Sequence, residues 1–309
     1  MKELWVEKYR PKTLKEYVVR DNAQRDQIQS WINDKAIPHL LLSGAPGVGK
    51  TTLAKVLFKE LDVSSYDILE INASRENSVD TVREKINNFV QIMPFGAYKY
   101  VLLDEADYMS PNGQAALRGV MEAYHTSARF IITCNYPNRI IPALHSRCQG
   151  YHMETIDKTE LTARIAEILI AENTDQDIDT LDTYVKASYP DLRKCINMIQ
   201  QNCREGKLMP PASGDSGQQD YRLQMVELFK QGKINEARKL VCSQARPEEC
   251  EEIYRWLYDN LDIISKDEDN QDKAVLIIKQ GLVDHSFVAD PEINLASVMI
   301  KLARLSNGQ

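Results

Sequence analysis

The pattern of apolar and polar residues changes near the middle of the chain. Between residues 38 and 153, short apolar runs bounded by turn residues alternate with stretches whose apolar residues recur every three or four positions. The apolar runs predict five buried strands: Pro38–Ser43, Asp67–Asn72, Lys99–Leu103, Arg129–Cys134 and Gln149–Met153. The longer stretches predict helices, among them Ser78–Met93 and Pro111–Tyr124. Ser110 followed by Pro111 is a good helix start, because a capping hydroxyl precedes a proline at the first position. This alternation favours an α/β domain with a parallel sheet covered on both faces.

The rest of the chain has helical spacing with one interruption. Residues 157–204 carry apolar side chains at helical spacing throughout, and so do residues 221–309. Between them, residues 205–220 (E-G-K-L-M-P-P-A-S-G-D-S-G-Q-Q-D) are rich in Gly, Pro and Ser and predict a linker. We therefore expect an α/β domain at 1–154, a small helical domain at 155–204, the linker at 205–220 and an all-helical domain at 221–309.

Composition narrows the function classes. The chain has 309 residues and a formal net charge of -7, so it is not a generally basic nucleic-acid binder, and any DNA contact must come from a local basic patch. Its six cysteines show no C-x-x-C spacing, which favours reduced thiols in a cytoplasmic protein. No apolar run approaches membrane-spanning length, and the first residues have no apolar signal core. We therefore expect no membrane partner.

A phosphate-binding motif follows the first predicted strand. Residues 44–51 read G-A-P-G-V-G-K-T and fit G-x-x-x-x-G-K-[ST], between a strand and a helix that begins near Thr51. Such a loop offers backbone amides and a helix N-terminus to an anion. We expect Lys50 to reach the β and γ phosphates of a nucleotide and the Thr51 hydroxyl to ligate Mg2+. The predicted nucleotide-binding residues here are Gly44, Ala45, Pro46, Gly47, Val48, Gly49, Lys50, Thr51 and Thr52.

The third predicted strand ends in two carboxylates, the usual second half of such a site. Asp104 and Glu105 follow Y-V-L-L directly. We expect Asp104 to hold Mg2+ through water and Glu105 to polarise the attacking water as a general base. Asp107 completes the sequence D-E-A-D, and a solvated side chain would also explain it. A helicase of the D-E-A-D type would need further helicase motifs and a second motor domain, neither of which is visible.

Four further segments make the pattern more specific. They are W-V-E-K-Y-R-P-K at residues 5–12, R-F-I-I-T-C-N-Y at 129–136, S-R-C at 146–148 and Y-P-D-L-R-K at 189–194. In this order, with the P-loop, they resemble the AAA+ superfamily and within it the clamp-loader ATPase subunits. The resemblance implies a P-loop AAA+ domain, a small helical lid domain and a C-terminal helical collar domain that joins subunits.

The resemblance also implies roles for single residues. Tyr9 and Arg10 would lie near adenine, and Asn135 would be the sensor of the γ-phosphate and water. Arg147 would be an arginine finger that acts on a neighbouring subunit's ATP, and Arg193 would face the γ-phosphate in its own subunit. Taken alone, Asn135 could equally begin a turn and the two arginines could be surface residues.

Two segments bear on the subfamily and on DNA. Residues 288–296 (V-A-D-P-E-I-N-L-A) are similar to the last collar helix of the clamp-loader large subunit of T-even-type bacteriophages, which would place the protein in a bacterial host's cytoplasm; replication factor C small subunits are similar as well. The helix at 78–93 would track DNA, with Arg83 the leading contact. Many relatives carry a basic residue where Asn77 stands, so the coupling of DNA contact to Glu105 is in doubt.

The function implied is that of a Mg2+-dependent ATPase that opens a sliding clamp and loads it on primer–template DNA. Its partners would be the clamp, the DNA, other copies of itself and a companion subunit in an open ring. Gln114 and Arg118 share a helix face that is either solvated or meets the next subunit, and Met93–Phe95 could contact the clamp. The alternatives are a non-hydrolysing ATP-switched scaffold subunit and another AAA+ remodelling ATPase. A GTPase or small-molecule kinase would leave S-R-C unexplained.

Overall fold

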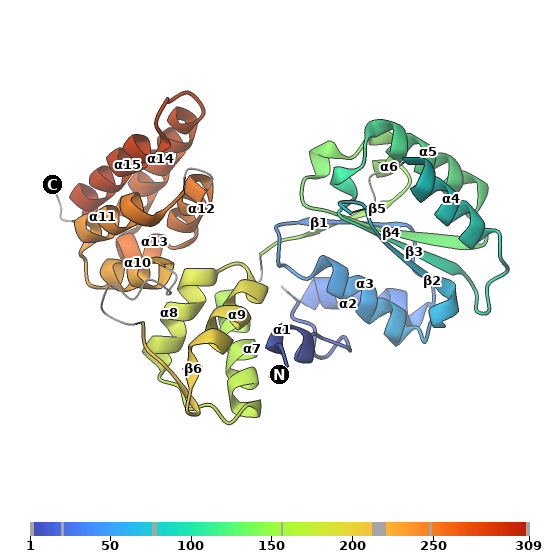
Figure 1. Cartoon of the computed structure of the whole chain (residues 1–309), viewed down its shortest axis with the longest axis horizontal. Helices are drawn as coiled ribbons and strands as arrows, with labels where there is room; N and C mark the ends of the chain where they lie inside the picture. Colours follow the sequence, from blue (N-terminus) through green and yellow to red (C-terminus); the bar gives the residue numbers. More distant parts are fainter. Residues whose placement is uncertain are drawn as a thin grey trace. The chain divides into compact units, whose positions relative to one another are not determined.

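The chain forms two compact units. The computed structural model describes residues 3–19, 22–75, 79–155, 157–211, 221–246 and 249–306, without the side chains of residues 79–82. The first unit comprises residues 1–164 and 190–193, and the second comprises residues 165–189 and 194–309 (Figure 1). Asn77 and residues 212–220 of the predicted linker lie outside the described residues.

A five-stranded parallel sheet forms the centre of the first unit. Its strands are β1 (Leu40–Gly44), β2 (Ile68–Asn72), β3 (Lys99–Asp104), β4 (Ala128–Cys134) and β5 (Gln149–Met153). They pair in parallel in the order β2-β3-β4-β1-β5. Each strand begins and ends within two residues of the predicted run, so the α/β class is confirmed.

Helices cover both faces of this sheet (Figure 1). Because successive strand side chains point to opposite faces, Leu40 and Leu42 lie in one core and Leu41 lies in the other. The first core is completed by α2 (Asn22–Asn33) and α3 (Lys50–Glu60), and the second by α4 (Val79–Val90) and α5 (Pro111–Ala123). The Ser110 hydroxyl accepts a hydrogen bond from Gly113 N–H at 3.2 Å, which confirms the predicted start of α5.

Short elements complete the first unit at the ends of strands and helices. They are α1 (Trp5–Lys8), η1 (Ser65–Asp67), η2 (Ala106–Tyr108), η3 (Pro137–Arg139), α6 (Pro142–His145) and the beginning of α7 (Lys158–Ala171).

The register of the strands aligns three carboxyl ends. Ser43 of β1 lies opposite Cys134 of β4, and Leu103 of β3 lies opposite Ile132 of β4. The residues that follow therefore meet at one edge of the sheet, where open α/β sheets bind ligands. This edge holds the P-loop and the two acidic residues.

The second unit is almost entirely helical. Its helices are the rest of α7, α8 (Ile178–Ser188), most of α9 (Leu192–Asn202), α10 (Tyr221–Lys230), α11 (Ile234–Gln244), α12 (Cys250–Asp259), α13 (Leu261–Ile264), α14 (Glu268–His285) and α15 (Pro291–Ser306). Helix α8 packs against α10, where the Thr183 hydroxyl donates to Glu227 Oε1 at 2.6 Å and accepts from Lys230 Nζ at 2.9 Å.

A short hairpin replaces part of the predicted linker. Strands β6 (Cys203–Arg204) and β7 (Lys207–Leu208) pair in antiparallel fashion around a turn at Gly206, whose φ is 73°. Residues 203 and 204 were expected to be helical and residues 205–208 to be linker, so regular structure extends further here than composition suggested. The domain limits at 154, 204 and 220 stay predictions. Among the described residues, no helix is both long and apolar enough to span a bilayer.

Candidate active site

The predicted phosphate-binding loop joins β1 to α3. Two of its glycines are required by close approach and by backbone conformation. A Cβ at Gly44 would lie 2.3 Å from the Met153 carbonyl oxygen, and one at Gly47 would lie 2.2 Å from Asp191 Oδ1. Their φ angles of 152° and 80° are rarely adopted by residues with a side chain. Because α3 begins at Lys50, its N-terminus opens onto this loop and favours an anion there.

Lys50 is the buried cation of the site. Its Nζ donates hydrogen bonds to the carbonyl oxygens of Gly44 and Ala45 and to Asn135 Oδ1, each at 2.8 Å. Burial lowers the pKa of this ammonium, while Cys134, Asp104 and Asp107 oppose that shift. The contact with Asn135 joins the P-loop to the end of β4.

Asp104 and Glu105 are connected through one hydroxyl. Asp104 Oδ1 accepts from Thr51 Oγ1 at 2.7 Å and from Thr133 Oγ1 at 2.6 Å. The Thr133 hydroxyl in turn accepts from the Glu105 N–H at 3.0 Å. Glu105 has a φ of 58°, an uncommon conformation for a residue with a side chain, and this hydrogen bond helps to hold it.

The same group of oxygens is chemically suited to Mg2+. The Thr51 hydroxyl and the Asp104 carboxylate are hard oxygen donors in direct contact. Mg2+ is usually bound by one or two protein oxygens, with waters and substrate phosphates completing its shell. These residues therefore fit the ion that the sequence predicted for them.

Asp107 supports the predicted sensor. Its Oδ2 accepts from the backbone N–H groups of Asn135 (3.3 Å) and Tyr136 (3.2 Å). The side chain is only 6% exposed, so the interpretation of Asp107 as a solvated residue is wrong. The carboxylate holds the chain at the end of β4, where the Asn135 side chain meets Lys50.

One cavity of about 680 Å³ brings most of the predicted residues together, within the size range of small-molecule and cofactor sites. The predicted residues that line it are Arg10, Pro46, Gly47, Gly49, Lys50, Thr51, Thr52, Asp104, Glu105, Asn135 and Arg193. All of them belong to the first unit.

Several predicted residues do not line this cavity. Val48 is buried in the core beside β1, and Gly44 and Ala45 contribute the carbonyls that Lys50 binds. The Tyr9 carbonyl accepts a hydrogen bond from Arg164 at 3.2 Å. The expected contact of Tyr9 with adenine therefore stays a prediction, whereas Arg10 lies at the cavity itself.

The start of α9 also reaches the loop. Arg193, its second residue, is exposed and lines the cavity. Asp191, just before the helix, lies directly over Gly47, where its carboxylate fills the space that a side chain would need. The sequence motif at 189–194 is thus adjacent to the P-loop.

Arg147 lies outside the cavity of its own chain. It follows α6, its side chain is 30% exposed, and its guanidinium donates to the Ala143 carbonyl at 2.9 Å. It also pairs with Glu122 of α5, which accepts from Arg118 at 3.2 Å as well. Hydrogen bonds from Arg118 and Arg147 lower the pKa of the Glu122 carboxyl. The side chain is thus oriented at the surface of the first unit.

Two residues of this region were misjudged or missed from the sequence. Gln114 was expected to be solvated or to meet a second subunit, but it is 1% exposed and binds the carbonyls of Met109 and Arg139 and the N–H of Ile141. Thr133 was not singled out at all. Thr133 follows Ile132, which lies opposite Leu103, so its contact with Asp104 could be foreseen only by knowing that β3 and β4 are neighbours.

Comparison with known proteins agrees with this geometry. The family model described as "ATPase family associated with various cellular activities (AAA)" matches residues 40–154. A replication factor C small subunit of Methanococcus vannielii is 36% identical over 249 residues, covering 77% of this chain and 78% of its own length. One from Sulfurisphaera tokodaii is 35% identical and covers 97% of this chain and 95% of its own length. The chain belongs to the family of AAA+ clamp-loader ATPase subunits that includes the replication factor C small subunits.

A solved structure supports the fold of this family member. The Thermotoga maritima RuvB Holliday junction branch migration motor superposes with a TM-score of 0.56 and 15% identity, covering 76% of this chain and 85% of RuvB. At that identity the likeness concerns the fold alone. The two replication factor C small subunits are archaeal, and they do not show the phage-type resemblance expected from residues 288–296.

Proposed function

We propose that this clamp-loader ATPase subunit uses Mg2+-dependent ATP binding and hydrolysis to open a sliding clamp and load it on primer–template DNA. The observation that carries the proposal is the connected site at the sheet edge. Lys50 binds Asn135, Thr51 binds Asp104, and Thr133 links Asp104 to Glu105, so sensor, metal-binding and acidic residues surround one cavity.

Each group at the cavity has a part in hydrolysis. Lys50 and the loop amides would bind the β and γ phosphates, and Arg193 would neutralise charge on the γ-phosphate from α9. Thr51 and Asp104 would hold Mg2+, which would offset the negative charge of the phosphates. Glu105 would accept a proton from the attacking water, and Asn135 would orient that water. Tyr9 and Arg10 would lie towards the base.

Arg147 would complete the site of a neighbouring copy. Its guanidinium is at the surface and outside its own cavity, which suits a residue that acts in trans. Glu122 and the Ala143 carbonyl orient it before any neighbour arrives. A finger supplied in this way stabilises charge on the transferring phosphoryl group.

The clamp would dock on an exposed apolar patch of the first unit. We name as the apolar patch the side chains of Tyr66, Ile92, Met93 and Phe95, which are 59–87% exposed. Met93 and Phe95 belong to the segment between α4 and β3, and the Tyr66 ring lies 5.7 Å from that of Phe95. Apolar side chains gathered in this way are typical of protein–protein contacts.

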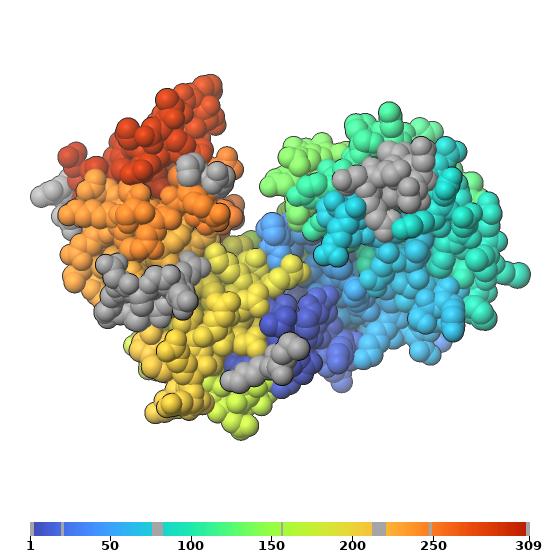
Figure 2. Space-filling model, in the orientation of Figure 1, coloured from blue at the N-terminus to red at the C-terminus, as the bar shows by residue number. Residues whose placement is uncertain are grey.

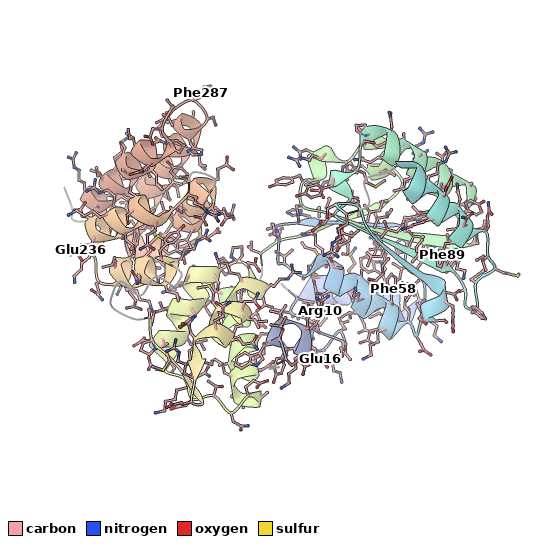
Figure 3. All side chains as sticks on the ribbon, in the orientation of Figure 1. Arg10, Glu16, Phe58, Phe89, Glu236 and Phe287 are labelled. Carbon is pink, nitrogen blue, oxygen red and sulfur yellow. The ribbon has the colours of Figure 1, made fainter. Side chains whose placement is uncertain are left out.

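DNA and subunit contacts would use other surfaces. Arg83 is exposed on α4 and is the leading candidate for a phosphate contact. The collar would join copies of the chain and a companion subunit through residues 221–309. Figure 2 shows α14 and α15 at the surface of the second unit, and Figure 3 shows Phe287, which is strongly exposed, in the turn between them. Such side chains favour burial against another chain.

Hydrolysis measured with and without partners tests the proposal. The full chain is assayed alone, with the sliding clamp of its replication system, and with clamp and primed DNA. Turnover should rise when both are present, and Glu105→Gln should bind ATP yet lose at least about a hundredfold in turnover, the usual scale for a positioned base. A chain that binds ATP but never hydrolyses it would support the scaffold alternative. ATPase activity indifferent to clamp and DNA would support another AAA+ remodelling function.

A further inference from the structure

A buried ion pair lies beneath the apolar patch. Lys99 Nζ and Asp67 Oδ1 are 2.8 Å apart, and the two side chains are 2% and 1% exposed. Asp67 ends η1, directly after Tyr66, and Lys99 begins β3, directly after the segment with Met93 and Phe95. The pair thus stands where the two segments that carry the patch return to the sheet.

Both charged groups are fully engaged, and most of their partners belong to these segments. Asp67 accepts from the N–H of Phe95 at 3.1 Å and from the N–H of Gly96 at 2.8 Å. Lys99 Nζ donates to the Tyr66 carbonyl at 2.9 Å and lies 4.9 Å from the centre of the Phe89 ring, which Figure 3 labels near the end of α4. Burial raises the pKa of Asp67, but the hydrogen bonds from Lys99, Gly96 and Phe95 outweigh it and hold the pKa below its ordinary value.

Net stability is a poor explanation for this arrangement. Taking two charges out of water costs several kcal/mol per ion, and an apolar pair of similar size often serves stability as well or better. An apolar pair cannot form directional hydrogen bonds that fix the positions of particular backbone groups. The carboxylate and the ammonium bind each other and three specific backbone groups, and so they fix the two segments relative to each other.

We propose that Asp67 and Lys99 are positioning residues for clamp docking, which hold the two segments of the apolar patch in the arrangement that fits the clamp. This inference rests on the proposed function of the patch. Neither residue would touch the clamp, because both are buried. They would hold the two segments in order before the clamp binds, so that less conformational entropy is lost on binding. Preorganised surfaces bind more tightly than flexible ones for this reason.

The test compares two double variants of the full chain. Asp67→Asn with Lys99→Met removes both charges while keeping similar volumes, so no unpaired charge is left in the interior. Met93→Ala with Phe95→Ala removes contact area from the patch and leaves the pair intact. Clamp affinity is measured by surface binding, the order of the segment by hydrogen exchange of the Phe95 and Gly96 amides, and folding by thermal unfolding and ATP binding.

We expect both variants to bind the clamp about tenfold more weakly or worse. In the charge-free variant, binding must order one or two further backbone residues, which costs about that much. In Met93→Ala with Phe95→Ala, binding buries less apolar surface. Only the charge-free variant should also exchange its Phe95 and Gly96 amides at least about tenfold faster, because asparagine offers one uncharged amide oxygen where the Asp67 carboxylate offers two oxygens to these amides. ATP affinity should be unchanged in both, since the pair does not line the cavity.

The results that would contradict the positioning role can be distinguished from those that would contradict clamp docking on the patch. If the amides of the charge-free variant exchange as in the unmodified chain, the pair does not order the segment, and the inference is overturned. If they exchange faster but clamp affinity is kept while Met93→Ala with Phe95→Ala loses it, the patch docks the clamp without needing the pair. If Met93→Ala with Phe95→Ala binds the clamp normally, the patch is not the docking surface, and the proposed docking fails together with the inference.

Discussion

Replacing Thr133 with valine should disturb the positions of the Asp104 and Glu105 carboxylates without weakening nucleotide binding. Thr133 is fully buried at the end of β4. Its hydroxyl donates to Asp104 Oδ1 and accepts from the Glu105 N–H. Valine has nearly the same shape, so the substitution removes the hydroxyl without opening a cavity. Both carboxylate-bearing residues lose one hydrogen bond in the same step.

The expected cost follows from those two hydrogen bonds. A buried N–H left without an acceptor costs about 1–3 kcal/mol, and a hydrogen bond to a charged group contributes about 1.5–3 kcal/mol. Asp104 keeps the Thr51 hydroxyl at 2.7 Å, and the open cavity lets water replace part of the loss. We therefore expect the free energy of unfolding to fall by about 2–4 kcal/mol.

The kinetic effect should be confined to turnover. Glu105 stands in an uncommon backbone conformation that this hydrogen bond helps to hold, so its carboxylate should drift from the attacking water. A positioned base contributes about 10²–10⁴-fold, and we expect Thr133→Val to lose about 10–100-fold of that in kcat. KM for ATP should change little, because Lys50 and the loop amides are untouched.

Steady-state ATPase measurements and urea unfolding check this prediction. Thr133→Ser keeps the hydroxyl and should recover most of the turnover. Thr183→Val is the matched control, since it removes a buried hydroxyl of the second unit that binds Glu227 and should lower stability without lowering kcat. Unmodified kcat in Thr133→Val would refute the positioning role. Equal losses in the valine and serine variants would point to packing instead of the hydroxyl.

Three further predictions concern charge. Arg147→Ala should bind ATP and assemble but lose about 10³–10⁵-fold in stimulated hydrolysis. Mixing it with Lys50→Ala should restore some activity, once fluorescence transfer has verified that subunits exchange. If no activity returns, either Arg147 does not act in trans or the ring needs all its sites together. Burial, with Arg129 and His125 nearby, lowers the pKa of His39 to about 4. The unfolded chain takes up this proton near its ordinary pKa of about 6.5, so the free energy of unfolding should fall as the pH is lowered from about 6.5 to about 4. Since solvent screens the half-buried ring, we expect a loss of about 1–2 kcal/mol. His39→Asn, but not the exposed His145→Asn, should remove this slope in urea titrations. Arg83→Ala should weaken DNA binding alike for all sequences and flatten its log–log salt dependence by about one unit, and an unchanged slope would move the DNA path elsewhere.

Local sequence was sufficient for the elements and for the motif residues. The strands are apolar runs bounded by turn residues, and Ser110, as an N-cap residue, predicts the helix that begins at Pro111. These signals depend on neighbours in the chain, so they can be read without the fold. The hairpin at 203–208 could not be, because its strands are only two residues long and are held by contacts with Asp175.

The residues that sequence reasoning misjudged all act across the fold. Gln114 and Asp107 are polar residues in ordinary surface-like contexts, and only tertiary structure shows that backbone groups far along the chain require them. Lys99 begins a predicted strand and was not singled out, yet it is among the largest fully buried side chains. A single sequence carries no signal for a polar side chain whose partners are distant backbone groups. Backbone N–H and C=O groups are alike in almost every residue, so no particular residue type marks the partner.

Strand order explains why the site exists at this edge at all. Along the chain, the strand before the P-loop comes first, the strand that ends at Asp104 comes third, and the strand that precedes Asn135 comes fourth. In the sheet, β4 lies between β3 and β1, so its last residues touch both neighbours: Thr133 binds Asp104 on one side, and Asn135 accepts from Lys50 on the other. A one-residue slip of β4 would turn the Thr133 hydroxyl to the other face of the sheet and break that link. The apolar core fixes the register, with Leu40 and Leu102 both opposite Ile131. It therefore also sets the distances between the P-loop, Asp104 and Asn135.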